Sequence, residues 1–134
     1  MNSSITLYLI RGCPGAGKST FAKHLLDIRL VEDVHEADAW FLHNNNGKFD
    51  ASKLNLAHIA CQEWTKMLLK AGKSVAVSNT STTEKEVEVY RLIAEQCNAN
   101  FISLIVENRH NGVNIHSVPE EKVQQMKDRF SVKL

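Results

Sequence analysis

The 134-residue sequence predicts a three-layer α/β fold in which a four-stranded parallel sheet lies between helices on both faces. Two observations lead to this prediction. Short runs of β-branched and apolar residues alternate along the chain with longer segments in which apolar residues recur every three or four positions. The composition, 43% apolar and 23% charged, is that of an ordinary globular domain. Because ligands of parallel sheets bind at the carboxyl ends of the strands, we expect functional residues there.

Four segments are expected to form the strands of this sheet. The first is a β-branched and aromatic run that ends at a glycine, and the second has the weakest pattern of the four. The expected strands cover residues 5–10, 30–35, 74–79 and 101–106.

The clearest helix is expected over residues 51–70, with Asp50 as its N-cap and Gly72 after its end. Its apolar residues recur at steps of three and four and form one face: Leu54, Ala57, Cys61, Trp64 and Leu68. Two further helices are expected over residues 19–26 and 82–97, the second with Val87, Tyr90, Ala94 and Cys97 facing inward. A last helix is expected to open at Pro119.

Length and composition narrow the class of protein. One domain over residues 1–134 is expected, and the net charge of +1 means that a nucleic acid would have to bind a local cluster of cations. The three cysteines, Cys13, Cys61 and Cys97, have no metal-type spacing and favour a reducing compartment. The first apolar run is too short to span a membrane. We therefore expect a cytoplasmic protein without a membrane partner, whose oligomeric state the sequence does not indicate.

Residues 12–20 read GCPGAGKST and match the pattern G-x-x-x-x-G-K-[ST] between an expected strand and an expected helix. Backbone N–H groups converge on a phosphate chain only where side chains leave room, which explains the glycines. The following helix directs its free N–H groups and positive dipole end at the same anion. The expected phosphate-binding residues are Gly12, Cys13, Pro14, Gly15, Ala16, Gly17, Lys18, Ser19 and Thr20.

Two side chains of this motif predict the cofactors ATP and Mg²⁺. Lys18 would bring a positive charge to the β- and γ-phosphates, and the Ser19 hydroxyl can ligate Mg²⁺. The alternative is a glycine-rich turn that matches by chance, but the match lies in the strand-to-helix context that the motif requires. The dinucleotide-binding pattern G-x-G-x-x-G is absent, as is the Asn-Lys-x-Asp motif of GTPases.

Four segments occur in a familiar order: IRGCPGAGKSTFAK, EADAWF, GKSVAVSNTSTT and HSVPEEKV. In this respect the sequence resembles the P-loop kinase domain of phage-type 5′-hydroxyl polynucleotide kinases and their small phage and bacterial relatives. The resemblance spans nearly the whole chain. It implies a kinase-like P-loop NTPase fold of the AAA-like or zeta-toxin-like kind. It also implies transfer of the γ-phosphate of ATP to the 5′-hydroxyl of a DNA or RNA end.

The resemblance implies that Asp38, in EADAWF, is the general base that contacts the acceptor hydroxyl. A carboxylate is ionised at neutral pH, and a weak base suffices when the nucleophile keeps its proton until late in a loose transition state. The alternative is that Asp38 is one of several solvated acids in VEDVHEAD. We expect that description to fit Glu32, Asp33 and Glu36.

The resemblance also implies an arginine that closes over the phosphates, and Arg109 is the candidate for this catalytic role. An exposed loop arginine is the alternative. The chain departs from the family pattern here, because the position before the Asn of the lid segment holds Val113 and the lid is shorter. Arg109 would then act alone or with Lys122.

Other departures bear on the acceptor. Where the phage enzymes carry a second acid and a basic residue that grips a 3′-phosphate, this chain has Ala39 and Phe41. Trp40 and Phe41 could stack on a base, although core packing is the favoured role of Trp40. The third strand ends with neutral residues, among which Asn79 is either a hydrogen-bonding partner of the acceptor or a turn-forming residue.

Three hypotheses follow. The first is a Mg-ATP-dependent kinase of nucleic-acid 5′-hydroxyl ends with Lys18, Asp38 and Arg109 as catalytic residues. The second keeps the chemistry but has a nucleoside, nucleotide or other small metabolite as acceptor, which the missing cation after Asp38 favours. The third is a nucleotide-binding module or slow ATPase that acts through a partner.

Overall fold

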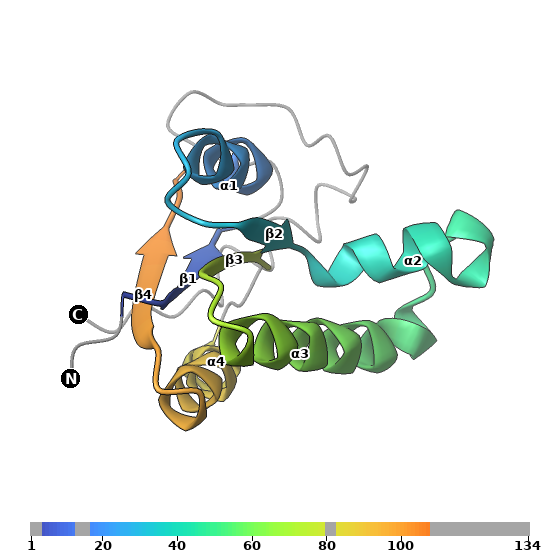
Figure 1. Ribbon diagram of the computed structural model, residues 1–134. Helices are drawn as coiled ribbons and strands as arrows, with labels where there is room; N and C mark the ends of the chain where they lie inside the picture. Colours follow the sequence, from blue (N-terminus) through green and yellow to red (C-terminus); the bar gives the residue numbers. More distant parts are fainter. Residues whose placement is uncertain (1–3, 13–16, 80–82, 108–134) are drawn as a thin grey trace.

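The computed structural model describes residues 4–12, 17–79 and 83–107. In these ranges strands and helices alternate, with short 3₁₀ turns (η) around α2 (Figure 1). The elements are β1 (Thr6–Arg11), α1 (Lys18–Asp27), β2 (Asp33–His35), η1 (Ala37–Ala39), α2 (Trp40–His43), η2 (Asn45–Gly47), η3 (Ala51–Lys53), α3 (Leu54–Lys70), β3 (Val75–Ser78), α4 (Glu84–Gln96) and β4 (Asn100–Ile105). The helix expected from Pro119 lies outside the described residues.

The four strands form one parallel sheet with the order β2-β3-β1-β4. This confirms the expected fold class, and each expected strand is present, although β2 covers only Asp33–His35 of the expected residues 30–35. The central strand β1 pairs with β3 on one side and β4 on the other. Strand β3 therefore lies between β2 and β1. Because the strands are parallel, the acidic segment after β2 and the glycine-rich segment after β1 leave the sheet at the same edge.

Helices cover both faces of the sheet (Figure 1). On one face, α1 packs Ala22 and Leu25 against Ile10 and Ala76. On the other face, α3 and α4 pack against the fully buried side chains of alternate strand residues, which are Leu7, Leu9, Val75 and Val77. Because both faces of the sheet are buried, these strands consist of continuous apolar runs, as is typical of a parallel sheet.

Helix α3 ends at Lys70 as expected but begins at Leu54, because the expected first turn, residues 51–53, is the 3₁₀ turn η3. The Asp50 carboxylate accepts hydrogen bonds from the Ser52 N–H at 2.9 Å and the Ser52 hydroxyl at 2.7 Å, which caps the turn leading into the helix. After the helix, Gly72 has φ of 82°, a conformation that ends helices and favours glycine. The hydrogen bonds from Ser52 lower the pKa of the exposed Asp50 carboxyl.

The inward face of α3 differs in part from the expected one. The buried residues are Ala57, Cys61, Thr65 and Leu69, whereas Leu54, Trp64 and Leu68 are half-buried at the margin of the core. Thr65 is tolerated inside because its hydroxyl donates to the Cys61 carbonyl of the same helix at 2.7 Å. In α4 the expected inward residues Val87, Tyr90 and Ala94 are buried together with Ile93, and Cys97 is half-buried.

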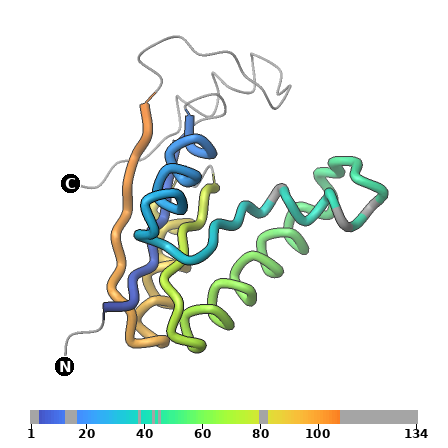
Figure 2. The backbone as a smooth tube through the Cα atoms, turned by 45° about the horizontal axis from the view of Figure 1, so that its top comes forward, coloured from blue at the N-terminus to red at the C-terminus, as the bar shows by residue number. Residues whose placement is uncertain are grey.

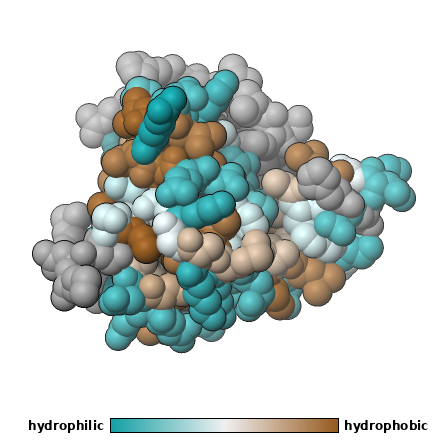
Figure 3. Space-filling view, in the orientation of Figure 1, coloured by the Kyte–Doolittle hydropathy of each residue, from teal (hydrophilic) through white to brown (hydrophobic). Residues whose placement is uncertain are grey.

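The segment from α2 to the first turn of α3 projects from the body of the molecule as an arm, residues 40–56 (Figure 2). Within it, η2 contains Asn46 and Gly47, both with positive φ, where an Asn-Gly turn signal stands in the sequence. The arm exposes the apolar side chains of Leu42, Phe49 and Leu56. A second group of exposed apolar residues, Leu26, Ile28 and Leu30, lies at the end of α1, over which Figure 3 shows apolar surface.

Candidate functional site

The glycine-rich motif joins β1 to α1. Gly12 is buried directly after β1, and Gly17 precedes the first residue of α1 with φ of 97°. A β-carbon on Gly17 would come no closer than 3.9 Å to Val106, so the backbone conformation rather than space requires glycine. Cys13, Pro14, Gly15 and Ala16 lie outside the described residues. The described ends of the motif therefore have the strand-to-helix geometry that the sequence predicts.

Lys18 and Ser19 are the first two residues of α1 and are half-buried, and Thr20 after them is exposed. At the end of β1 the side chain of Arg11 is 3% exposed. Burial lowers the pKa of its guanidinium, while the carboxylates of Glu84 and Glu86 in the first turn of α4 favour the charged form. Arg11 lies on the same face of β1 as Leu7 and Leu9, toward α4, whereas Lys18 opens α1 on the other face of the sheet.

The Ser19 hydroxyl donates a hydrogen bond of 2.5 Å to Oε1 of Glu36. The expectation that Glu36 is a solvated acid is therefore wrong. Strand β2 ends at His35, so Glu36 leaves the sheet at its carboxyl edge, where the first turn of α1 lies within reach. In the sequence, nothing distinguishes Glu36 from the neighbouring acids except that it stands two residues before Asp38.

The oxygen atoms around Ser19 suit Mg²⁺. A hydroxyl has one proton and two lone pairs, so donation to Glu36 leaves the lone pairs of Ser19 available to a cation. Mg²⁺ prefers such oxygen ligands and is commonly held by one or two carboxylates together with phosphates and water. Within the described ranges no group of three or more His, Cys, Asp or Glu side chains could hold a metal on its own. A metal here would therefore need oxygens from a phosphate ligand as well.

Ser78, the last residue of β3, pairs with Ile10 beside the motif. Its hydroxyl is buried and has no hydrogen-bond partner in the described part of the chain. Side chains alternate between the faces of a strand, so Ser78 shares the α1 face with Ala76. A buried hydroxyl of this kind is suited to a hydrogen bond with a ligand or its hydration shell.

Asp38 lies in η1, the turn directly after β2, as the sequence predicts for the candidate base. The backbone N–H of Ala37, which precedes it, donates to Oδ1 of Asn79 at 2.8 Å. The amide nitrogen of Asn79 in turn donates to the Tyr90 hydroxyl at 3.1 Å. The buried side chain of Asn79 thus binds other parts of the protein and is not directed at an acceptor. Residues 80–82 lie outside the described residues, so the turn-forming role stays a prediction.

The aromatic residues after β2 pack mainly against the protein. Phe41 is 3% exposed and contacts Trp40 edge-on, with ring centroids 5.0 Å apart, so Phe41 is not available to stack on a base. Trp40 is half-buried against the core, which agrees with its favoured packing role.

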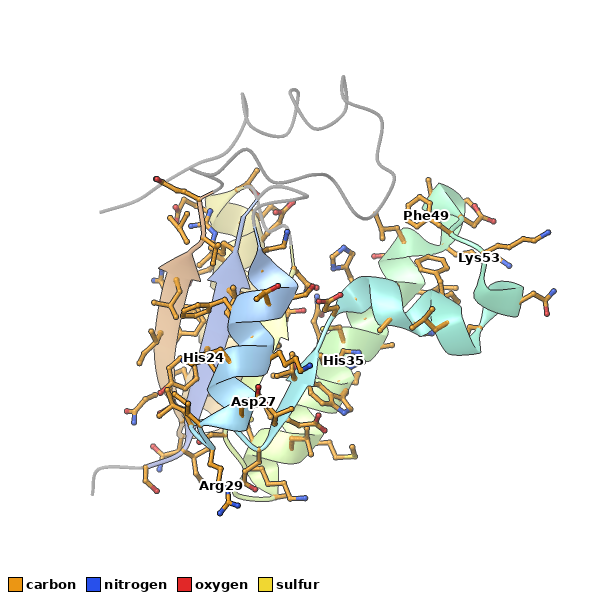
Figure 4. All side chains as sticks on the ribbon, turned by 90° about the horizontal axis from the view of Figure 1, so that it is seen from above. His24, Asp27, Arg29, His35, Phe49 and Lys53 are labelled. Carbon is orange, nitrogen blue, oxygen red and sulfur yellow. The ribbon has the colours of Figure 1, made fainter. Side chains whose placement is uncertain are left out.

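Trp64, assigned to packing, stacks on His35 with centroids 4.3 Å apart. His35 lies where β2 passes α3, whereas Phe49 and Lys53 lie far out on the arm (Figure 4). Burial lowers the pKa of the His35 imidazole, which favours its neutral form.

Arg109, Lys122 and Val113 lie outside the described residues, so the expected arginine lid stays a prediction. In the described ranges no helix has the length and apolar character needed to cross a membrane.

A family model described as an AAA domain matches residues 7–132 of the chain. A chain of the Pnkp1/Rnl/Hen1 RNA repair complex superposes with a TM-score of 0.68 at 16% identity, over 96% of this chain and 38% of that one. The APS kinase CysC of Mycobacterium tuberculosis gives a TM-score of 0.61 at 17% identity, over 95% and 97% of the two chains. Kti12 of Chaetomium thermophilum, in complex with ADP-AlF3, gives 0.69 at 12% identity, over 94% and 80%.

At these identities the solved structures show the fold alone, and the fold is that of P-loop kinases. The chain spans well under half of the chain that it matches in the RNA repair complex. Two of the similar proteins were solved with nucleotides, APS kinase with AMPPNP and Kti12 with ADP-AlF3. The expected kinase-like P-loop class is confirmed, and the narrower resemblance to phage enzymes stays a prediction.

Proposed function

The chain belongs to the AAA domain family, and from that premise we propose that it is an ATP-dependent phosphotransferase. It transfers the γ-phosphate to a hydroxyl group, and the first candidate acceptor is the 5′-hydroxyl of a DNA or RNA end. The nucleotide binds with its phosphates at residues 12–20.

The contact between Ser19 and Glu36 carries this proposal. Ser19 belongs to the phosphate-binding motif, and Glu36 leads into the turn that contains Asp38. A direct hydrogen bond therefore joins the nucleotide-binding helix to the acidic segment, although β2 and β1 are not neighbours in the sheet. Phosphoryl transfer requires that the triphosphate and the group that receives the proton lie together, which this arrangement favours.

Each residue has a proposed role. Lys18 binds the β- and γ-phosphates, and Ser19 with Glu36 beside it holds the metal. When bound, Mg²⁺ neutralises charge on these phosphates. Asp38 accepts the proton of the attacking hydroxyl late in the reaction. Arg109, outside the described residues, is proposed to bind the transferring phosphate.

Replacing Glu36 with glutamine is expected to raise the Mg²⁺ concentration for half-maximal nucleotide binding about 10- to 100-fold, the usual effect of changing a partner of a metal ligand. Glutamine keeps an oxygen for the Ser19 hydroxyl but removes the negative charge beside the metal. The measurement is a Mg²⁺ titration of the binding of a fluorescent ATP analogue. Glu32→Gln, an exposed acid four residues earlier, is the matched control. If Glu36→Gln needed the same Mg²⁺ concentration as the wild type, Glu36 would not be part of the metal site.

Two features support a nucleic-acid end as acceptor. The first is the order of the four sequence segments that resemble polynucleotide kinases. The second is the arm after the acidic turn, where Phe49 is 63% exposed and follows Lys48 in the sequence. An exposed aromatic ring near a cation is the combination with which proteins bind single strands. Buried, apolar Phe41, at the place of the family's phosphate-gripping cation, instead favours a small-molecule acceptor.

A panel of acceptors with γ-labelled ATP tests the proposal. We expect label at the 5′ end of 5′-hydroxyl DNA or RNA oligonucleotides and none on 5′-phosphorylated ones. Labelling of a nucleoside, nucleotide or other metabolite, with the oligonucleotides inert, would select the small-molecule acceptor. If no acceptor is labelled although ATP binds, the chain is a nucleotide-binding module or slow ATPase. The neutral residues Ser78 and Asn79 at the end of β3 favour that last candidate.

A further inference from the structure

A small buried network of polar groups surrounds Asn79 at the end of β3. The Asn79 side chain is 5% exposed. Its Oδ1 accepts from the Ala37 N–H at 2.8 Å, while its Nδ2 donates to the Tyr90 hydroxyl at 3.1 Å and to the Cys61 sulfur at 3.8 Å. One side chain therefore joins the turn η1 to the helices α3 and α4.

The bond to Ala37 continues the sheet where its backbone pairing stops. Strand β2 pairs with β3 through three residues, the last of which is His35 opposite Val77. Two residues further along in the same register, Ala37 would stand opposite Asn79. There the backbone of β2 has already turned into η1, and the side chain of Asn79 binds the Ala37 amide instead. This contact joins positions 42 residues apart in the sequence.

The rest of the network fixes the orientation of the Asn79 amide. Tyr90 and Cys61 accept from its nitrogen, which leaves the oxygen directed at Ala37. Burial raises the pKa of the Cys61 thiol and of the Tyr90 hydroxyl, so both groups are neutral at physiological pH. A neutral, fully occupied network deep in the protein holds its geometry, because any other arrangement would leave a buried polar group unpaired.

We propose that Asn79 is a positioning residue for phosphoryl transfer, which fixes the turn Ala37–Ala39 that carries Asp38 without itself touching substrate. The catalytic consequence rests on the proposed function. A displacement of about 1 Å of a reacting group can lower the rate about 100-fold. The phosphate-binding motif is held separately by β1 and α1, so the affinity for the nucleotide without Mg²⁺ does not depend on this bond.

The structural part of the proposal is tested by amide hydrogen exchange, which needs neither nucleotide nor acceptor. In Asn79→Leu the Ala37 amide loses its acceptor, and we expect its exchange to accelerate at least about tenfold. Asn79→Asp keeps an oxygen for Ala37, and the Tyr90 hydroxyl can rotate to donate to the second carboxylate oxygen. We expect Asn79→Asp to restore protection of the Ala37 amide to near the wild-type level.

The catalytic part is tested with the acceptor found by the labelling panel. Asn79→Leu is expected to lower kcat, measured at saturating Mg²⁺, about 10- to 100-fold, while the Kd of ATP without Mg²⁺ stays within about twofold. Asn79→Asp is expected to recover most of the lost kcat. Ser74→Ala is the matched control, because it removes the hydrogen bond that the Thr6 N–H donates to the Ser74 hydroxyl at the opposite end of β3, away from the turn. If Asn79 only stabilised the fold, Asn79→Leu and Ser74→Ala would instead lower kcat alike.

Unchanged exchange at Ala37 in Asn79→Leu, or a wild-type kcat with faster exchange, would overturn the proposal. If Asn79→Leu does not fold, Tyr90→Phe is the second variant, because it removes one hydrogen-bond partner of the Asn79 side chain. Unchanged exchange of the Ala37 amide in Tyr90→Phe would equally overturn the proposal. A wild-type protein that transfers no phosphate contradicts the proposed function, whereas the exchange result still decides whether Asn79 holds the turn.

Discussion

Replacing Lys18 with alanine is expected to lower the rate of phosphate transfer at least about 100-fold, the usual effect of removing one group that stabilises transition-state charge. Lys18 opens α1 directly after the positive-φ residue Gly17, so it lies at the end of the helix where we propose that the phosphates bind. Weaker binding of Mg-ATP is expected as well, since the lysine also contacts the ground-state phosphates. Single-turnover transfer from γ-labelled ATP and titration with a fluorescent ATP analogue measure the two effects.

Lys23 provides the matched control for this experiment. It is an exposed lysine on the same helix, and Lys23→Ala removes the same charge away from the motif. We expect Lys23→Ala to bind and transfer like the wild type. Full binding and transfer by Lys18→Ala would mean that the glycine-rich segment is not the nucleotide site.

Replacing Asp38 with asparagine is expected to lower transfer about 10²–10⁴-fold, the range for loss of a general base. Binding of Mg-ATP is expected to change little, because the phosphates are bound from the other side by residues of the motif. Asparagine has nearly the shape of aspartate, so the turn η1 is expected to keep its conformation. The comparison of kcat with nucleotide Kd therefore separates catalysis from binding.

Asp33→Asn is the control for Asp38→Asn. Asp33 is an exposed acid at the start of β2, and its Oδ1 accepts from the Val34 N–H, a bond that asparagine can keep. Wild-type transfer is expected for Asp33→Asn. If Asp38→Asn also transferred phosphate at the wild-type rate, Asp38 would be an ordinary solvated acid.

The parts of the fold that depend on local rules could be predicted from the sequence. The Asp50 cap, the glycine after α3 and the strand runs each follow from a few neighbouring residues. The glycine before α1 is required by its own backbone angle and is visible in the motif. The buried face of α3 was predicted only in part. Thr65 has a polar side chain, but it can be buried because its hydroxyl donates to a backbone carbonyl of the same helix.

The parts of the site that depend on strand order could not be predicted. Asn79 reaches Ala37 because β2 and β3 are neighbours in the sheet, and Glu36 reaches Ser19 because α1 packs against β2 as well as β3. Alternation of apolar and polar residues gives the type of each element but not this order. For the same reason the acidic run VEDVHEAD offered no means of separating Glu36 from the exposed acids beside it.

A crystal structure of the protein with AMPPNP and Mg²⁺ tests the central claim most directly. The account predicts that the metal lies against the Ser19 hydroxyl, that the ammonium group of Lys18 contacts the terminal phosphate, and that this phosphate faces the turn Ala37–Ala39. A triphosphate bound elsewhere on the molecule, or one whose terminal phosphate points away from that turn, would contradict it.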